Sequence, residues 1–237
     1  MKKQRTKSKK LLKEIQTLSL ISSTIVSSKF LDDILSQIVK LTADMFGSKI
    51  CSIMLLDEKK EELIIKATQS LSEKYKNKPP VKIGSSISGL AVKERRPIFV
   101  LDVKKDPRYM FPSIAEEEGL CSMLAVPMVV KDKIIGVLNI YTATEYEFSQ
   151  EEIDVLQTIA NQAALAIENA RLFEELIITK DTLETKKLVD RAKALLIKHR
   201  NFTEEEAHRF LQKKSMDLRK PVKEIAQAII LTFEEKK

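Results

Sequence analysis

The sequence predicts an α+β fold in which an antiparallel sheet is flanked by helices and is followed by a long connecting helix and a small all-α unit. Short apolar runs typical of strands recur between residues 50 and 141, and charged turns join several of them. Helical periodicity precedes and follows this region. No Pro or Gly occurs between Gly136 and Pro221, which allows a long helix before the final unit.

The N-terminal region predicts a tail and two helices. Residues 1–10 carry six Lys or Arg and no acid, so we expect a basic, disordered tail. Apolar residues at helical spacing then predict helices over 11–27 and 30–46. Gly47 ends the second helix as a left-handed cap.

The middle of the chain predicts about five or six strands, linked as hairpins. We expect a polar loop over 74–80, a short helix over 86–94 and a long irregular segment over 102–118. The predicted strands are 50–56, 63–68, 98–101, 122–130 and 134–141.

A long helix is predicted to begin near Ser149, which forms a capping box with Glu152. A heptad-like seam of small and apolar residues follows, namely Leu156, Ala160, Ala163, Ile167 and Ala170. The apolar side of a helix of this length must be buried against another element, and a second copy of the chain could provide that element. We therefore expect a homodimer through residues 11–46 and 149–185.

Composition narrows the classes of function. The two cysteines, Cys51 and Cys121, lie in apolar runs and lack metal-ligand spacing, so we expect buried thiols, no metal and no cofactor. No run approaches the roughly 18 apolar residues of a membrane span, and no signal peptide is evident. We expect a cytoplasmic protein without a membrane partner.

The last part of the chain is strongly basic. Twelve Lys or Arg stand between Lys186 and Lys223 against five Asp or Glu. Thr203 with Glu206 predicts a capping box, and Pro221 stands at a favoured first helical position. A basic helical unit behind a slightly acidic body indicates a regulator that binds nucleic acid.

Residues 29–173 resemble a GAF domain. The resemblance rests on Gly89 within 87–91, Arg96-Pro97, Asp102 with Pro107, Gly119, and the segments 122–127, 136–138, 148–149 and 166–172. It implies a small-molecule pocket over one face of the sheet, with Ser52, Met54, Phe99, Tyr109, Cys121 and Met123 as candidate lining residues. Two alternatives stay open: a functional Cys121 that anchors a chromophore or senses redox state, and a GAF domain that only dimerises.

Residues 183–229 resemble an ANTAR domain, the three-helix RNA-binding module of transcription antiterminators. The matching residues are Leu183-Glu184, Lys186, Val189, 191–193, Leu196, 204–207, Leu211, 215–217, Pro221 and Ile225-Ala226. The resemblance implies RNA contacts from Lys186, Arg191, Lys193, Gln212, Lys213, Ser215 and Arg219. Three positions depart from the family pattern: Lys186 and Gln212 replace Arg, and Ala194 replaces Gly.

These resemblances predict three regions: a tail over 1–10, a GAF sensor domain with dimerisation helices over 11–175, and an ANTAR domain over 176–237. We expect a transcription antitermination regulator that is not an enzyme. Its expected partners are hairpin loops of nascent RNA, a second copy of the chain, and an unidentified small molecule or upstream signalling protein. The alternatives are a redox or small-molecule enzyme using Cys51 and Cys121, and a dimeric interaction module that does not bind RNA.

Overall fold

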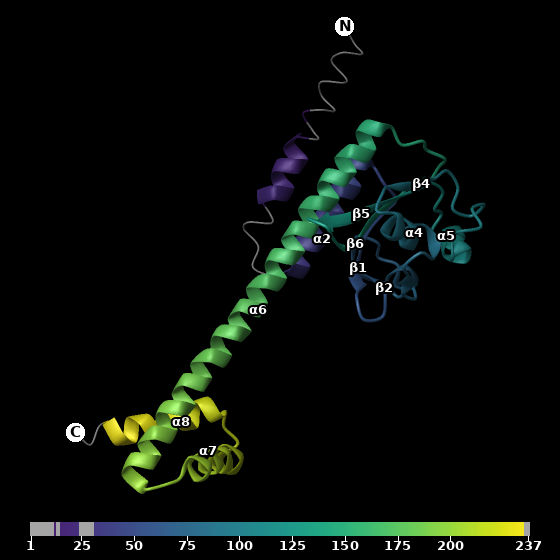
Figure 1. The fold of residues 1–237 in the computed structure, drawn as a ribbon. Coiled ribbons are helices and arrows are strands. Elements are labelled where there is room, and N and C mark those ends of the chain that lie inside the picture. The colour runs from purple at the N-terminus through teal and green to yellow at the C-terminus, as the bar shows by residue number, and fades with distance from the viewer. Residues whose placement is uncertain (1–11, 13–14, 24–30, 235–237) are drawn as a thin grey trace. The chain divides into compact units, whose positions relative to one another are not determined.

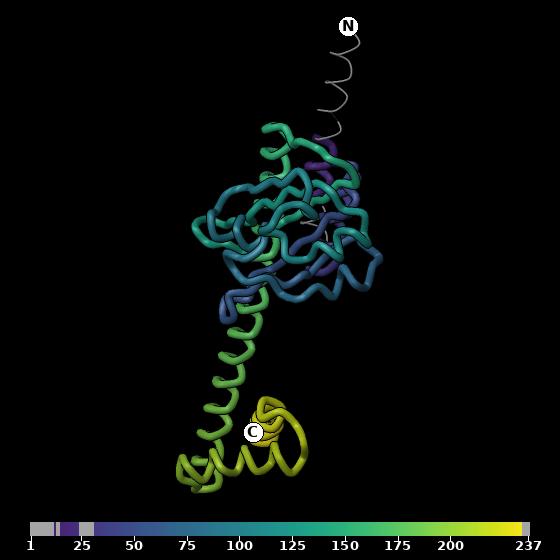
Figure 2. The backbone as a smooth tube through the Cα atoms, turned by 90° about the vertical axis from the view of Figure 1, so that its right-hand side faces the viewer, coloured from purple at the N-terminus to yellow at the C-terminus, as the bar shows by residue number. Residues whose placement is uncertain are grey.

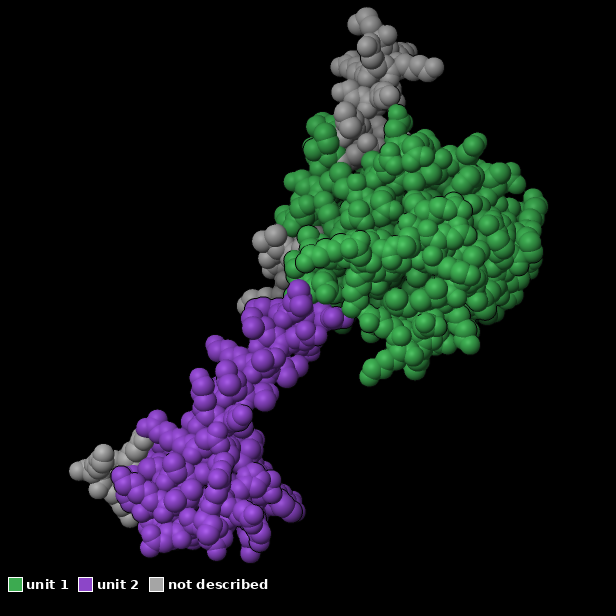
Figure 3. All heavy atoms as spheres, viewed as in Figure 1, with its two compact units in different colours: residues 1–170 green, residues 171–237 purple. Residues whose placement is uncertain are grey.

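The computed structural model describes residues 12, 15–23 and 31–234, which fall into two compact units. The units are residues 1–170 and residues 171–237 (Figure 3). Residues 15–23 are helical, whereas the remaining parts of the predicted helix 11–27, apart from helical Leu12, and the predicted basic tail lie outside the described residues.

The first unit contains a six-stranded antiparallel sheet, which confirms the predicted α+β class. Its strand order is β3-β2-β1-β6-β5-β4. The strands are β1 (Ile50–Asp57), β2 (Glu62–Thr68), β3 (Val81–Lys82), β4 (Ile98–Val100), β5 (Met123–Val130) and β6 (Lys133–Tyr141). Besides the helical residues 12 and 15–23, the described residues form the helices α2 (Leu31–Phe46), α3 (Glu73–Lys76), α4 (Ser86–Glu94), α5 (Pro112–Glu117), α6 (Gln150–Arg200), α7 (Glu204–Leu218) and α8 (Val222–Glu234).

Two helices cover one face of the sheet. Helix α2 and the beginning of α6 lie side by side against it (Figure 1). Leu35 and Ile38 of α2 pack there with Leu156 and Ile159 of α6 and with Leu138 of β6, and all five are almost completely buried. Burial of this apolar surface is the main stabilising contribution to the unit.

This packing corrects the predicted dimer seam. Leu156, Ala160 and Ala163 are fully buried, and Ile167 is 6 % exposed, all within the core of the first unit. The expectation that this side of the helix lacks cover within the chain was wrong. Small residues at heptad-like spacing serve equally well where a helix lies closely on a sheet and another helix, so their spacing did not identify the partner.

Loops and short helices cover the other face of the sheet. Seen from the side, the teal strands and loops of the first unit lie in front of helix α6 (Figure 2). Gly89 in α4 allows the helix to approach β3, because a Cβ atom there would lie 2.3 Å from the carbonyl oxygen of Lys82. Gly89 therefore stands where the sequence predicts a close backbone approach.

Three short elements were not predicted. Helix α3 falls in the predicted polar loop, where the Ser72 side chain accepts a hydrogen bond from the Tyr75 backbone N–H. Strand β3 has two residues, and α5 begins at Pro112 inside the predicted irregular segment. Elements this short lack the repeated apolar positions from which periodicity is recognised.

The corrected packing predicts unequal effects of two substitutions in α6. Ala163→Glu places a carboxylate in an apolar core and should reduce the free energy of unfolding by about 3 kcal/mol or more. Leu165→Glu is the matched control, because Leu165 is 51 % exposed; we expect a change within about 0.5 kcal/mol. Urea unfolding followed by circular dichroism measures both, and equal stabilities would contradict the packing described.

Candidate nucleic-acid interface and sensor cluster

The second unit is built on a small core shared by α6, α7 and α8. Its buried members are Ala192, Leu196, Ala207, Leu211, Ile225, Ala226 and Ile230. The predicted capping box is present at the start of α7: the Thr203 side chain accepts from the Glu206 N–H, and the Glu206 carboxylate accepts from the Thr203 N–H. This cap fixes where α7 begins relative to the end of α6.

Two ion-pair clusters tie the three helices together. Lys193 Nζ lies 2.9 Å from Asp190 and 3.3 Å from Glu204, which joins α6 to α7. Lys223 Nζ lies 2.7 Å from Asp181 and 2.8 Å from Glu184, which joins α8 to α6. Hydrogen bonds to Asp190 and then Glu204 raise the pKa of Lys193. Lys193, a predicted RNA contact, is thus engaged within the unit, and its side chain is 18 % exposed.

Three of the other predicted RNA contacts are exposed cations. Lys186 lies on α6, Lys213 on α7, and Arg219 at the left-handed C-cap of α7 with φ of 51°. Within the part of the chain that the structure describes, none of the three pairs with a carboxylate. Arg191 is exposed as well, but five residues after Lys186 it points about 140° away around the helix.

The three helices of this unit also form a groove of about 440 Å³. It is lined by Val189, His208, Leu211, Gln212, Ser215, Met216 and Val222. Gln212 Nε2 and His208 Nε2 are 3.0 Å apart, and the Ser215 hydroxyl donates to the Lys220 carbonyl oxygen at 2.5 Å. The predicted residues Gln212 and Ser215 therefore share this groove, whereas His208 and Met216 were missed. The four-residue spacing of His208 and Gln212 on one helix was the signal that could have found His208.

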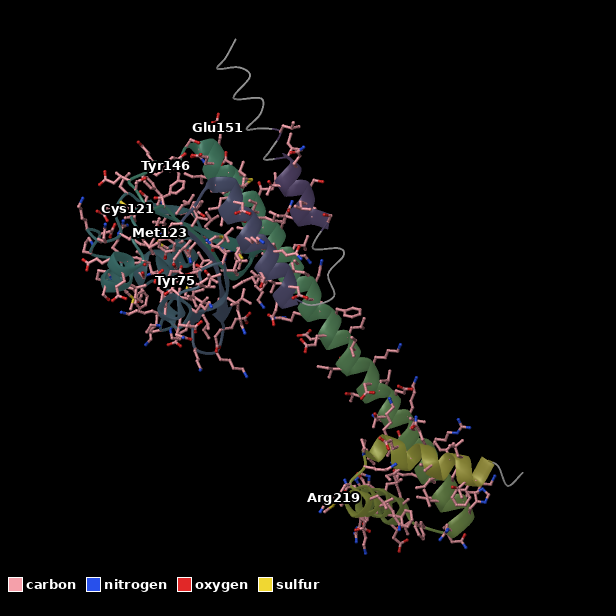
Figure 4. All side chains as sticks on the ribbon, turned by 180° about the vertical axis from the view of Figure 1, so that it is seen from behind. Tyr75, Cys121, Met123, Tyr146, Glu151 and Arg219 are labelled. Carbon is pink, nitrogen blue, oxygen red and sulfur yellow. The ribbon has the colours of Figure 1, made fainter. Side chains whose placement is uncertain are left out.

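In the first unit, polar and aromatic side chains gather on the sheet face opposite α2 and α6. The Ser52 and Tyr75 hydroxyls are 2.9 Å apart, and both side chains are buried. Tyr141 meets the rings of Tyr75 and Tyr109 edge to face, with centroids 6.0 and 6.4 Å apart. Of the predicted pocket residues, Met54, Tyr109 and Met123 belong to the core on this face, and Figure 4 labels Tyr75 and Met123 in this unit.

Lys78 joins this group and was not predicted. Its Nζ lies over four rings, at 4.6 Å from the centroid of Tyr75, 4.7 Å from Phe111, 5.5 Å from Tyr109 and 5.8 Å from Tyr141. Burial of the ammonium group lowers the pKa of Lys78 to about 7. In the sequence it reads as one more charge in a polar loop, because nothing local places its end among aromatic rings.

Two predicted pocket residues lie elsewhere. Phe99 packs with the core on the helix-covered face, where its ring meets Phe148 at 6.4 Å. Cys121 precedes β5, and its Sγ is 3.6 Å from the carbonyl oxygen of Leu101. Burial, and then the charge of Asp102, raises the pKa of the Cys121 thiol. Burial also raises the pKa of Cys51, which lies under the helices.

Other kinds of site are not evident in the described residues. Among residues 12, 15–23 and 31–234, no three His, Cys, Asp or Glu side chains gather as metal ligands would. None of the described helices is long and apolar enough to cross a membrane.

Comparison with known families assigns both units. Residues 28–168 match the GAF domain family, more than half of the chain. The chain belongs to the GAF domain family. Residues 179–230 match the ANTAR domain, so an ANTAR domain follows the GAF domain, as the resemblances predicted. This combination is that of a signal-responsive ANTAR regulator.

Curated relatives resemble the GAF part. A methyl sulfide methyltransferase-associated sensor of Methanosarcina acetivorans is 28% identical over 166 residues, which are 68% of this chain and 17% of that protein. The formate hydrogenlyase transcriptional activator of Salmonella typhimurium is 23% identical over 174 residues, which are 70% of this chain and 25% of that protein. The chain thus spans a quarter or less of the length of these relatives.

Solved structures agree with the GAF fold. The GAF domain of a phosphoenolpyruvate-protein phosphotransferase from Acinetobacter is 25% identical with a TM-score of 0.59, covering 68% of this chain and 97% of that one. The corresponding domain from Coxiella burnetii is 24% identical with a TM-score of 0.64, covering 69% and 98%. A free methionine-R-sulfoxide reductase from Neisseria meningitidis shares the fold at 19% identity and a TM-score of 0.59, covering 67% and 90%.

The ion pairs of the second unit predict different stability effects for two lysines. Lys193→Met breaks the link between α6 and α7 and should destabilise the unit by about 0.5–1 kcal/mol. Lys213→Met removes an exposed cation without a carboxylate partner in the described structure and should leave stability unchanged. Thermal unfolding at low and high salt measures the difference, which should shrink as salt screens the pairs. A larger loss in Lys213→Met would refute the assignment.

Proposed function

We propose that the protein is a transcription antitermination regulator whose ANTAR domain binds hairpin loops of nascent RNA under control of its GAF domain. The observation that carries this proposal is that three cations implied as RNA contacts, Lys186, Lys213 and Arg219, are exposed and lack a carboxylate partner in the described structure. The names of the curated relatives, a sensor and a transcriptional activator, are consistent with a regulatory GAF domain.

Hairpin loops suit this surface better than a duplex. The deep, narrow major groove of an A-form duplex excludes side chains, whereas loops expose unstacked bases and closely spaced phosphates. The cations would contact phosphates, and Gln212 and His208 offer hydrogen-bonding groups at the groove. No Phe, Tyr or Trp lines the groove, so ionic and hydrogen-bond contacts would dominate.

An enzyme that cycles Cys51 and Cys121 is not favoured. The two residues belong to segments on either side of β6, because β1 and β5 both pair with β6. Alternate strands are about 9.5 Å apart, and a disulfide needs Cα atoms within about 7 Å. The raised pKa values of both thiols also disfavour the reactive thiolate.

We further propose that the regulator is a homodimer, through a different surface from the predicted seam. Leu172, Leu176 and Leu183 follow spacings of four and seven residues in α6 and are 52%, 63% and 53% exposed. These spacings place them on one stripe of the helix, as in the a and d positions of a coiled coil. Exposed apolar stripes of this kind are typical of association surfaces.

RNA binding should depend on the exposed cations. Lys186→Ala, Lys213→Ala and Arg219→Ala should each weaken binding of a tandem-hairpin RNA and reduce the slope of log K against log salt by about 0.7–0.9. Filter binding at several salt concentrations measures both quantities. Lys236→Ala, in the same basic C-terminal region, is the matched control and should change neither.

The same titration separates specific from nonspecific binding. The wild type should bind the tandem-hairpin RNA more tightly than an RNA of equal length with scrambled loops. Equal affinities for the two RNAs would reduce the ANTAR unit to a basic interaction module. Unchanged binding by all three alanine variants would disprove the proposed interface.

Dimerisation should fail when the leucine stripe is charged. Leu176→Glu should raise the dimer dissociation constant at least tenfold, because an unpaired carboxylate would be buried at the interface. Ile178→Glu is the control, since Ile178 is 60% exposed but lies about 200° further round the helix. Light scattering at micromolar concentration should show twice the 27.0 kDa chain mass for the wild type and the control. A wild type of 27.0 kDa under these conditions would disprove the dimer.

A further inference from the structure

The GAF domain holds a cluster of hydrogen-bond donors that lacks an acidic partner. Six residues form this donor cluster, on one face of the sheet and in the segments that cover that face. They are Ser52, Tyr75, Lys78, Tyr109, Asn139 and Tyr141. Every one carries an O–H or N–H donor. In the described part of the chain, no carboxylate forms a hydrogen bond or ion pair with any of them.

Asn139 contributes an unused donor. Its side chain is 1 % exposed, and its Oδ1 accepts a hydrogen bond from the Ser88 hydroxyl at 3.1 Å. Its Nδ2 has no partner within the described structure. A buried amide N–H without an acceptor loses the hydrogen bonds that water would give it, so such a group is rare without a reason.

Lys78 contributes a cation without a counter-ion. Its Nζ lies over four aromatic rings, and its polar contact there is the Tyr109 hydroxyl at 3.5 Å. Ring faces stabilise a cation only partly, whereas an anion would both neutralise it and accept its protons. This arrangement therefore lacks a negatively charged hydrogen-bond acceptor.

Strand pairing places Asn139 on the same face of the sheet as Tyr141, one of the rings that Lys78 contacts. Ser52 lies directly opposite Asn139 in the pairing of β1 with β6, and it contacts the Tyr75 hydroxyl. Tyr141 is two residues after Asn139 and therefore faces the same side. The Tyr141 ring also lies near Lys78, with 5.8 Å between its centroid and Nζ.

We propose that the donor cluster binds a small monocarboxylate, whose oxygens accept hydrogen bonds from Lys78 Nζ and Asn139 Nδ2. One cation matches a single negative charge better than the two of a phosphate dianion. The aromatic rings provide an apolar wall for a short carbon chain, and their close edge-to-face packing limits its size. The inference rests on the proposed sensor role of the GAF domain and gives its ligand a chemical class.

Binding should weaken as the pH rises above 7. In the free protein burial lowers the pKa of Lys78 to about 7, and a bound carboxylate would raise it by stabilising the ammonium form. Binding above pH 7 therefore requires proton uptake, and affinity should fall about tenfold per pH unit there. The facing titratable groups, Tyr75 on α3, Tyr109 in the loop before α5 and Tyr141 on β6, have raised pKa values and stay protonated.

Calorimetry on the full chain tests the proposal, with formate, acetate, propionate and butyrate as probes at pH 6 and pH 8. At least one should bind saturably, more tightly at pH 6, while acetamide and inorganic phosphate should not. Lys78→Met and Asn139→Leu should each weaken binding at least tenfold, with folding checked by thermal unfolding. Lys76→Met is the matched control, because Lys76 lies two residues away, is exposed and pairs with Glu73.

Several outcomes would overturn the proposal. These are no saturable binding of any probe by the wild type, equal binding of acetamide, binding of phosphate alone, or unchanged affinity in folded Lys78→Met. The tandem-hairpin RNA is titrated separately with the same preparation. RNA binding without carboxylate binding would remove this inference alone, whereas carboxylate binding without specific RNA binding would remove the antitermination proposal and leave the sensor site.

Discussion

The alternation of side chains along β6 from Val137 to Tyr141 is the constraint on which the GAF unit depends. Leu138 and Ile140 point into the core beneath α2 and α6, whereas Val137, Asn139 and Tyr141 point to the opposite face. Because β6 is paired on both sides, a slip of one residue would exchange these two sets. Such a slip would turn the amide of Asn139 and the phenol of Tyr141 toward the helices. It would turn the apolar side chains of Leu138 and Ile140 toward the polar face. The apolar face thus fixes the register, and the register places the polar groups.

Helix α6 shows how one continuous helix meets different requirements along its length. Its first turns are buried in the GAF core, and its last turns supply Ala192 and Leu196 to the ANTAR core. Between them lie the exposed leucines, which neither core uses. A helix whose middle is apolar and exposed gains stability from a partner at that place, since an isolated helix gains little from propensity alone. Association and signal transfer can therefore share the same segment.

Much of the fold was predictable because it follows from local rules. Seven elements lie within one residue of their predicted bounds, namely α2, α4, β1, β2, β4, β5 and β6. The capping boxes at Ser149 and Thr203 are present as well. The seam through Ala163 was misread, because small residues at heptad spacing suit a sheet as well as a second helix. The prediction that Phe99 lines the pocket was wrong, because Phe99 faces the helices while its neighbours Ile98 and Val100 face the other side. A strand of only three residues is too short for its alternation to be read from the sequence.

The functional residues were harder to predict, because the sequence shows which side chains are charged but not which groups surround them in the fold. Lys193 lies on the matching ANTAR motif, yet two carboxylates hold it within the unit. Lys213, from the same basic region, is exposed, while Lys78 from a polar loop lies over aromatic rings. The three ammonium groups are chemically identical, and only tertiary contacts distinguish the structural pair of Lys193 from the cations for which we propose a phosphate contact, Lys213, and a ligand contact, Lys78. The buried amide of Asn139 is informative for the same reason. Its Nδ2 lacks a hydrogen-bond partner only because the fold excludes water from it, and the sequence does not show this.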